Sequence, residues 1–224
     1  MKIMGHRGAR HEAPENTLAS IERALAAGAE GIEIDVHFSR CGRLVVIHDE
    51  TLDRTTNGNG PVGALDLAEL QALDAGEGQQ IPTLDEVLLA VGDRAELFVE
   101  LKAPGCEEAV VAAIRNRGRI ESSYVISFVH PWLQTVGKLE PALRTGCLIY
   151  GRPADPAGLL RAAGASVLSM GIALVDGRLV EQCHEAGLQV CVWNCNEPSE
   201  VAGYAALGVD WLGTDVPTAV CALA

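Results

Sequence analysis

Three carboxylates stand on two short apolar stretches of this sequence, and their spacing indicates a cation site. In "GIEIDVHF", Glu33 and Asp35 alternate with isoleucine and valine, and in "AELFVELK" Glu100 follows the same alternation. Successive residues of a strand point to opposite faces of a sheet, so the carboxylates of one strand share a face. If that face is the interior of a closed sheet, unpaired charge there is very costly. Three carboxylates from adjacent strands suit a hard divalent cation such as Mg²⁺ or Ca²⁺.

Each stretch also has a simpler interpretation. On a half-exposed antiparallel strand, Glu33 and Asp35 would only form the solvated face. Glu100 and Lys102 lie two residues apart in "ELK" and could form an internal salt bridge. Taken together, the two stretches favour the cation site.

Two histidines stand at the ends of apolar stretches, where they could transfer protons. His6 ends "KIMGH" and is followed by Arg7, and His48 ends "VVIH". An imidazole titrates near neutral pH and can serve as an acid or a base. Arg7 and Lys102 beside a cation would form a local anion site, since a guanidinium binds two phosphate oxygens at once. The other histidines are interpreted as structural: His11, His37, His130 at a helix start, and His184 within a helix.

Alternating strands and helices must position these side chains. Eight apolar stretches, each followed by an Ala/Leu-rich helical segment, are the strand candidates: 2–8, 31–38, 95–102, 123–128, 143–150, 166–170, 188–196 and 209–217. This alternation requires parallel strands, and eight units predict a closed (β/α)₈ TIM barrel, with an open doubly wound sheet as the alternative. Barrel enzymes keep their active sites at the carboxyl ends of the strands, where both histidines would lie. In the first helix, Leu18, Ile21 and Leu25 are predicted to line one apolar face.

One segment interrupts this rhythm. Residues 39–82 begin as a hairpin with "RCG" as the turn and "RLVVIHD" as the return strand, then continue through "TTNGNGPVG" and a short helix, "DLAELQAL". Connections this long on a compact barrel are usually functional. With no linker-like segment elsewhere, we expect one domain over 1–224 with 39–82 as an insertion subdomain.

Composition excludes several classes of partner. A formal net charge of −13 argues against nucleic acid and anionic membranes. No apolar stretch reaches the ~20 residues of a membrane span, so we expect no membrane insertion. Seven cysteines without a CxxC pair favour reduced thiols in a cytoplasmic protein over disulfides or a zinc site.

Ordered motifs along nearly the whole chain resemble those of the glycerophosphodiester phosphodiesterase family. They are "HRGARHEAPENT", "GIEIDVHFSRCGRLVVIHDETLDRTTNGNG", "IPTLDEVL", "ELK", "ISF", "VWNCN" and "GTDVP". The resemblance implies a metal-dependent barrel enzyme that hydrolyses small glycerophosphodiesters to sn-glycerol 3-phosphate and an alcohol. Carried over by motif, the roles are metal ligation by Glu33, Asp35 and Glu100, acid/base catalysis by His6 and His48, phosphate contact by Arg7 and Lys102, and pocket lining by Trp193.

One position departs from the family pattern, and several alternatives stay open. After "SF" the family often has an aspartate, whereas this chain has Val129, which implies a lost helix cap or a changed pocket. By analogy His6 is the base and His48 the acid, with water or a glycerol hydroxyl as the nucleophile. Trp193 could instead be plain packing. Rival functions are a lysophospholipase D or phospholipase C-like enzyme acting on lipids, although "TLDRTTNGNGPVG" is polar, and a non-catalytic metal-stabilised barrel. Metal identity, head group and oligomeric state are left undetermined.

Overall fold

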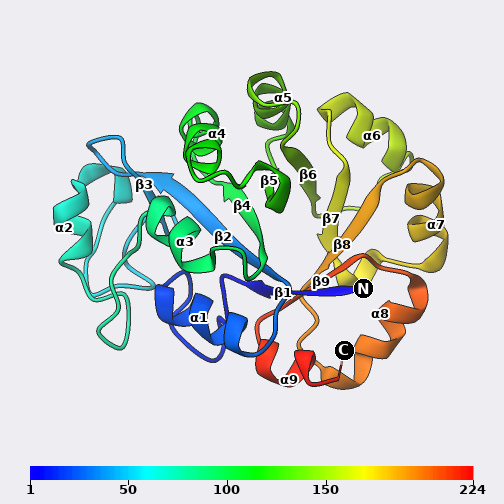
Figure 1. Cartoon of the computed structure of the whole chain (residues 1–224), viewed down its shortest axis with the longest axis horizontal. Coiled ribbons are helices and arrows are strands. Elements are labelled where there is room, and N and C mark those ends of the chain that lie inside the picture. Colours follow the sequence, from blue (N-terminus) through cyan, green and yellow to red (C-terminus); the bar gives the residue numbers. More distant parts are fainter. Residues whose placement is uncertain (224) are drawn as a thin grey trace.

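The computed structural model, which describes residues 1–223, contains a closed barrel of parallel strands (Figure 1). Its members are β1 (Lys2–His6), β2 (Gly31–Phe38), β4 (Glu96–Leu101), β5 (Ser123–Ser127), β6 (Arg144–Ile149), β7 (Val167–Gly171), β8 (Gln189–Trp193) and β9 (Trp211–Thr214). Each strand pairs in parallel with the next, and β1 closes the ring by pairing with both β9 and β2. The predicted (β/α)₈ TIM barrel is confirmed, and the open doubly wound sheet is wrong.

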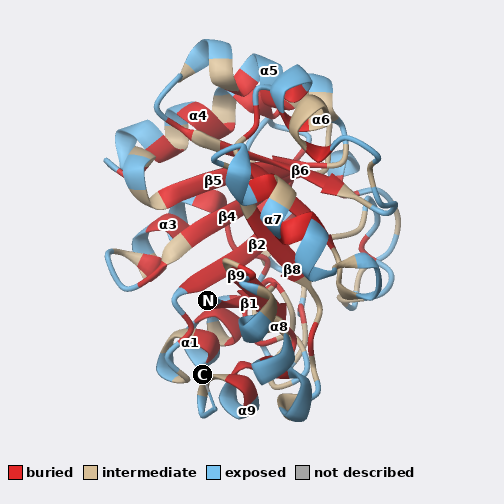
Figure 2. Ribbon diagram, turned by 90° about the vertical axis from the view of Figure 1, so that its right-hand side faces the viewer, coloured by how far each residue is buried: buried red, intermediate tan, exposed pale blue. Residues whose placement is uncertain are grey.

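Helices surround the barrel and cover its outer face. They are α1 (Leu18–Ala26), α3 (Leu84–Val91), α4 (Glu107–Asn116), α5 (His130–Leu139), α6 (Pro156–Ala163), α7 (Gly177–Glu185), α8 (Val201–Leu207) and α9 (Pro217–Cys221), with 3₁₀ turns η2 (Ile120–Ser122), η3 (Ile172–Leu174) and η4 (Pro198–Glu200). In Figure 2 most of each strand is buried, whereas the helices expose their outward faces. Polar N-cap residues determine where two of these helices begin. The side chains of Thr17 and Thr83 accept hydrogen bonds from backbone N–H groups in the first turns of α1 and α3.

Strand alternation divides the apolar residues into two cores. Ile32 and Ile34 belong to the large cluster between the strands and the helices. A smaller cluster fills the barrel interior, where the rings of Phe98 and Tyr124 stack at 4.2 Å and Trp211 packs edge-on at 4.9 Å from Phe98. These aromatic rings fill the barrel beside the strand starts, which leaves the carboxyl ends of the strands free for a polar site.

The buried face of α1 differs from the predicted apolar face. Leu18 is 38% exposed, and the buried residues of the helix are Ser20, Ile21 and Ala24. The Ser20 hydroxyl is needed inside because it donates to the carbonyl of Arg7 and accepts from the backbone N–H of Ala9, both at 2.8 Å. The helix therefore turns a polar residue inward to hold the "HRGA" turn.

The segment between β2 and α3 has elements and apolar contacts of its own. It contains β3 (Leu44–Val46), which pairs antiparallel with β2, then η1 (Val62–Ala64) and α2 (Leu67–Gln71). In Figure 1 these elements lie at the left edge, away from α7 and α8. A separate hydrophobic cluster holds them together: Val45, Ile47, Leu52, Val62, Leu70, Ala75 and Ile81. The division into one domain, 1–224, with an insertion over 39–82 stays a prediction.

Two expectations drawn from composition can be compared with the fold. All seven cysteines are free thiols, as expected. Among the helices of residues 1–223, none combines the length and apolar character needed to cross a bilayer.

We expect Ile34→Ala to destabilise the fold by about 2–5 kcal/mol, because it truncates a fully buried side chain and leaves a cavity that the packed helices cannot fill. Leu89→Ala is the control, since Leu89 is 67% exposed and its loss should change stability by less than about 0.5 kcal/mol. Urea unfolding followed by circular dichroism measures both. Equal midpoints for the two variants would show that β2 does not carry this packing.

Candidate active site

The carboxyl ends of the strands surround a cavity of about 270 Å³. Seven of the eight predicted site residues line it: His6, Arg7, Glu33, His48, Glu100, Lys102 and Trp193. The eighth, Asp35, is fully buried next to the carboxylates of Glu33 and Glu100. One concave site thus gathers residues from β1, β2, β4, β8 and the segment after β3.

Strand register brings the three carboxylates together. Asp35 of β2 lies opposite Glu100 of β4, and Glu33 lies opposite His6 of β1. One oxygen from each of the three carboxylates lies within 4.8 Å of the others. All three side chains are buried, so their charges repel one another with little solvent screening.

Burial and mutual repulsion shift the pKa values of the three carboxyl groups. Burial, together with repulsion from Asp35, raises the pKa of Glu100 to about 8 and holds the pKa of Glu33 well above its usual range. Burial also opposes charge on Asp35, but Arg7, His48 and Lys102 outweigh it and lower the pKa of Asp35.

A divalent cation fits this cluster. Asp35 Oδ1 is buried without a hydrogen-bond partner, and Lys102 Nζ, with which it forms an ion pair, lies 3.8 Å away, beyond hydrogen-bond distance. Oxygen donors alone are the ligands that Mg²⁺ and Ca²⁺ prefer. The orphaned oxygen and the crowded negative charge are both accounted for by a cation among Glu33, Asp35 and Glu100.

The "HRGA" turn aims both the backbone and the side chain of Arg7 at the carboxylates. Arg7 and Gly8 have positive φ angles of 53° and 81°, so the chain reverses sharply directly after β1. The Arg7 N–H donates to Glu33 Oε2 at 3.0 Å, and its Nε lies 3.4 Å from Asp35 Oδ2. Burial opposes charge on this guanidinium, but Asp35, Glu33 and Glu15 outweigh it and raise the pKa of Arg7. Arg7 is therefore a fixed cation at the cavity wall.

Lys102 and His48 form a second polar group across the cavity. Lys102 Nζ donates to Glu100 Oε1 at 3.1 Å and lies 3.0 Å from His48 Nε2. Burial opposes charge on Lys102, but Glu100 and Asp35 outweigh it and raise its pKa. Burial lowers the pKa of His48, so a neutral imidazole accepts from the charged amine through Nε2. Its Nδ1 then carries the proton that is donated to Asp49 Oδ1 at 2.5 Å.

His6 is oriented by a carboxylate from the far end of the chain. His6 Nδ1 lies 2.6 Å from Asp215 Oδ1, and its Nε2 lies 3.9 Å from Glu33 Oε2. Asp215 also accepts hydrogen bonds from the side-chain amides of Asn194 and Asn196, each at 2.8 Å. Burial opposes charge on Asp215, but the bonds from His6 and Asn196 outweigh it and hold its pKa well below the usual range.

The sequence interpretation missed these orienting groups. They are Glu15, Asn16, Asp49, Asn194, Asn196 and Asp215. Asn16, for example, donates from its side-chain amide to Asp35 Oδ2 at 2.9 Å. All six lie within the motifs that carry the family resemblance. Their position as polar residues close to strand ends is the feature of the sequence that could have identified them.

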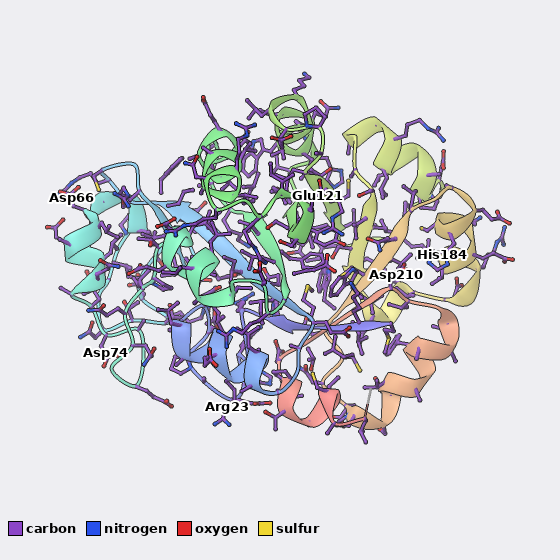
Figure 3. All side chains as sticks on the ribbon, in the orientation of Figure 1. Arg23, Asp66, Asp74, Glu121, His184 and Asp210 are labelled. Carbon is purple, nitrogen blue, oxygen red and sulfur yellow. The ribbon has the colours of Figure 1, made fainter. Side chains whose placement is uncertain are left out.

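The four histidines predicted to be structural lie outside the cavity lining. His37 Nε2 contacts the carbonyl of His48 at 3.1 Å, and His130 Nε2 contacts the carbonyl of Leu148 at 3.0 Å. His184 pairs with Asp210 at 2.9 Å on the outer surface, where Figure 3 labels both. His11 lies 3.7 Å from Asp215 Oδ2.

Near the cavity mouth, Trp193 packs with two other aromatic side chains. The rings of Phe128 and Tyr150 stack at 4.4 Å, and each lies edge-on to Trp193. The indole Nε1 of Trp193 is buried without a partner. Val129, which follows Phe128, stands at the start of α5 without a side-chain cap, as a lost N-cap implies.

We expect the cation-free protein to lose stability as pH rises from about 4.5 to about 8. The pKa of Glu100 is raised from 4.5 to about 8 on folding, so over this interval the folded state binds more protons than the unfolded state. Urea midpoints in EDTA across this range measure the effect. In Glu100→Gln the decline should be shallower, whereas the exposed control Glu108→Gln should follow wild type. Parallel curves for all three proteins would contradict the assignment.

Comparison with known proteins places this site in a family. A model of the glycerophosphoryl diester phosphodiesterase family matches residues 6–219. The chain is 37% identical over 96% of its length to a glycerophosphodiester phosphodiesterase from Caldanaerobacter subterraneus, of which it covers 94%. It is 33% identical over 96% of its length to one from Bacillus altitudinis, of which it covers 95%.

Solved structures agree with the sequence relatives. A glycerophosphodiester phosphodiesterase from Agrobacterium tumefaciens superimposes with a TM-score of 0.90 at 35% identity over 99% of both chains. An Oleispira antarctica phosphodiesterase, in complex with the product sn-glycerol 3-phosphate, superimposes with a TM-score of 0.91 at 29% identity, covering 100% of this chain and 96% of that one. The family match begins at His6 and extends past Asp215, so it spans the whole histidine and carboxylate site, and the chain is an enzyme belonging to the glycerophosphoryl diester phosphodiesterase family.

Proposed function

We propose that this enzyme hydrolyses small glycerophosphodiesters to sn-glycerol 3-phosphate and an alcohol. The observation that carries the proposal is the convergence of three buried carboxylates and two carboxylate-oriented histidines on one cavity. The product complex of the Oleispira antarctica relative supports the same substrate class. The free thiols and the net charge of −13 fit action in the cytoplasm on a water-soluble, deacylated substrate.

Glu33, Asp35 and Glu100 would hold Mg²⁺ or Ca²⁺. When bound, such a cation neutralises phosphoryl oxygens and so stabilises the negative charge that develops during hydrolysis. Arg7 and Lys102 add fixed positive charge to the same site, one beside each oxygen of Asp35, and both are already held in place by the carboxylates. Fixed charges of this kind supply much of the rate in phosphoryl chemistry, because they need no reorganisation.

The two histidines would divide the proton transfers. With its Nδ1–H directed at Asp215, His6 presents the lone pair of Nε2 to the cavity and acts as the base. The proton that His6 takes up would come from the nucleophile, which is either water or the neighbouring glycerol hydroxyl. Attack by the glycerol hydroxyl would give a cyclic phosphate. His48 would act as the acid after Nε2 has taken up a proton from solvent, which it then gives to the oxygen of the leaving alcohol. The Asp49 carboxylate would stabilise the imidazolium formed in between. Trp193, with its free indole N–H, would contact the substrate.

Release of sn-glycerol 3-phosphate from glycerophosphocholine and glycerophosphoethanolamine tests the substrate class. We expect activity with Mg²⁺, Ca²⁺ or Mn²⁺, none in EDTA, and a loss of about 10³-fold or more in Glu33→Ala, which removes one cation ligand. Lysophosphatidylcholine and liposome sedimentation form the second arm. Cleavage of the lysolipid alone would favour the lysophospholipase D alternative, and inactivity on every substrate would favour the non-catalytic barrel.

We expect His6→Ala and His48→Ala each to lower kcat/KM by about 10²–10⁴-fold, because each removes one proton transfer. His184→Ala is the matched control, since it deletes an imidazole paired with Asp210 far from the cavity and should retain wild-type kinetics. If either cavity variant kept kcat/KM within a few-fold of wild type, that histidine would have no part in the reaction.

A further inference from the structure

We propose that Arg54, in the segment between β2 and α3, is a positioning residue that fixes His48 through Asp49. The inference rests on the proposed function, in which His48 transfers a proton. Arg54 itself is absent from the cavity lining, so it does not touch substrate. Its role would be to lock the orientation of the imidazole that does.

Arg54 binds two carboxylates at once with three nitrogens. Its Nε donates to Asp49 Oδ2 at 2.7 Å and its Nη2 to Asp49 Oδ1 at 3.0 Å. On the other side, Nη2 and Nη1 donate to the two oxygens of Glu15 at 2.8 and 2.9 Å. The two bonds from Arg54 to Asp49 fix the plane of that carboxylate, because rotating it would break both.

The carboxylate so fixed is the one that orients His48. Asp49 Oδ1 accepts from His48 Nδ1 at 2.5 Å while its other oxygen is occupied by Arg54. The bond on Nδ1 sets the ring plane and the tautomer, which leaves Nε2 facing Lys102 at 3.0 Å in the cavity. Without Arg54, Asp49 is free to rotate away from the imidazole, since its side chain is 28% exposed and adjacent to water.

The far side of the guanidinium is anchored to the barrel. Glu15 also accepts from Arg7 Nη1 at 2.8 Å, so a continuous chain of ion pairs joins the His48 side of the cavity to the Arg7 side. Burial opposes charge on Glu15, but Arg54 and Arg7 outweigh it and lower the pKa of Glu15 to about 2. The carboxylate between the two arginines is therefore ionised at neutral pH.

Local structure holds Arg54 at the right place for this contact. Two residues before it, Leu52 is fully buried in the small hydrophobic cluster. The turn is then closed by bonds from the Thr56 N–H to the Leu52 carbonyl at 3.1 Å and from the Gly60 N–H to Asp53 Oδ2 at 3.0 Å. The polar "TLDRTTNG" stretch is thus an ordered turn whose arginine points back at the barrel.

A double-mutant cycle between Arg54 and His48 tests the inference. In the wild-type background, we expect Arg54→Gln to lower kcat by about tenfold or more with KM within about twofold, because it disturbs proton transfer and not binding. In the His48→Ala background, the same substitution should have almost no further effect on the residual activity, since the group it positions is gone. Arg54→Lys should behave like Arg54→Gln, because an ammonium cannot span both carboxylates.

Arg40→Gln is the matched control. Arg40 lies in the same segment and binds two carboxylates, Asp66 and Glu69, with a side chain 52% exposed compared with 45% for Arg54. Asp66 lies at the outer edge of the molecule, far from the barrel (Figure 3). Arg40→Gln should leave kcat unchanged. A decrease in kcat seen only with Arg54→Gln would therefore not be a general effect of losing a surface ion pair.

The possible outcomes separate the inference from the proposed function. If His48→Ala keeps wild-type kcat, His48 is not the acid, and the inference falls together with the proposed role of His48, whereas the substrate class still depends on the release of sn-glycerol 3-phosphate. If His48→Ala is impaired but Arg54→Gln lowers kcat equally in both backgrounds, Arg54 acts elsewhere and only the inference is overturned. Full activity of Arg54→Lys would likewise overturn it, because charge alone would then suffice. Should Arg54→Gln not fold, Arg54→Lys takes its place in the cycle.

Discussion

Mutual repulsion among three buried carboxylates is the constraint on which the rest of the site depends. Glu33, Asp35 and Glu100 cannot all be ionised side by side in a low-dielectric interior without opposite charge nearby. Arg7 and Lys102 offset part of this cost, and a divalent cation would offset the rest. Each of these counter-charges has to be placed to within about an ångström, and the barrel supplies that precision by strand register and by the turn after β1.

The two histidines of the cavity are likewise held in place by neighbouring charged and polar groups. On one wall, Asp215 and the asparagines after β8 hold His6. On the other, Asp49 and Arg54 hold His48 with groups that lie outside the barrel strands. Both imidazoles bond to a carboxylate through Nδ1, which leaves both Nε2 atoms for the cavity. The segment after β2 is therefore part of the catalytic apparatus in our proposal, and not only a connection.

Much of this architecture was predictable because it repeats at short range. The period-2 alternation around Glu33 and Asp35 identified a polar interior face, and eight strand-helix units were enough to predict closure of the sheet. The partners of the catalytic groups were not predictable in this way. Asp215 meets His6 across 209 positions of sequence, and only the closure of β9 onto β1 brings them together.

The polarity of a residue is a poor guide to its position where tertiary hydrogen bonds decide which side chains are buried. The apolar pattern of α1 includes Leu18, but Leu18 is exposed, and Ser20 is buried because the turn after β1 needs its hydroxyl. Arg54 went unrecognised for a related reason. Nothing in a polar loop indicates that its guanidinium reaches Glu15, 39 residues away, as well as the nearby Asp49, and the contact depends on how Leu52 anchors the turn.

Calorimetric titration of Mg²⁺ or Mn²⁺ into the cation-free protein would show whether the three carboxylates bind a cation. At about pH 7, in buffers of different ionisation enthalpy, we expect binding to release protons, because the pKa of the Glu100 carboxyl is raised to about 8 and its proton has to leave when a cation binds. The part of the release that comes from Glu100 should decline as the pH rises above about 8, and Asp35→Asn should weaken binding severely. Binding without proton release, or binding that Asp35→Asn leaves unchanged, would show that the three carboxylates are not the cation site.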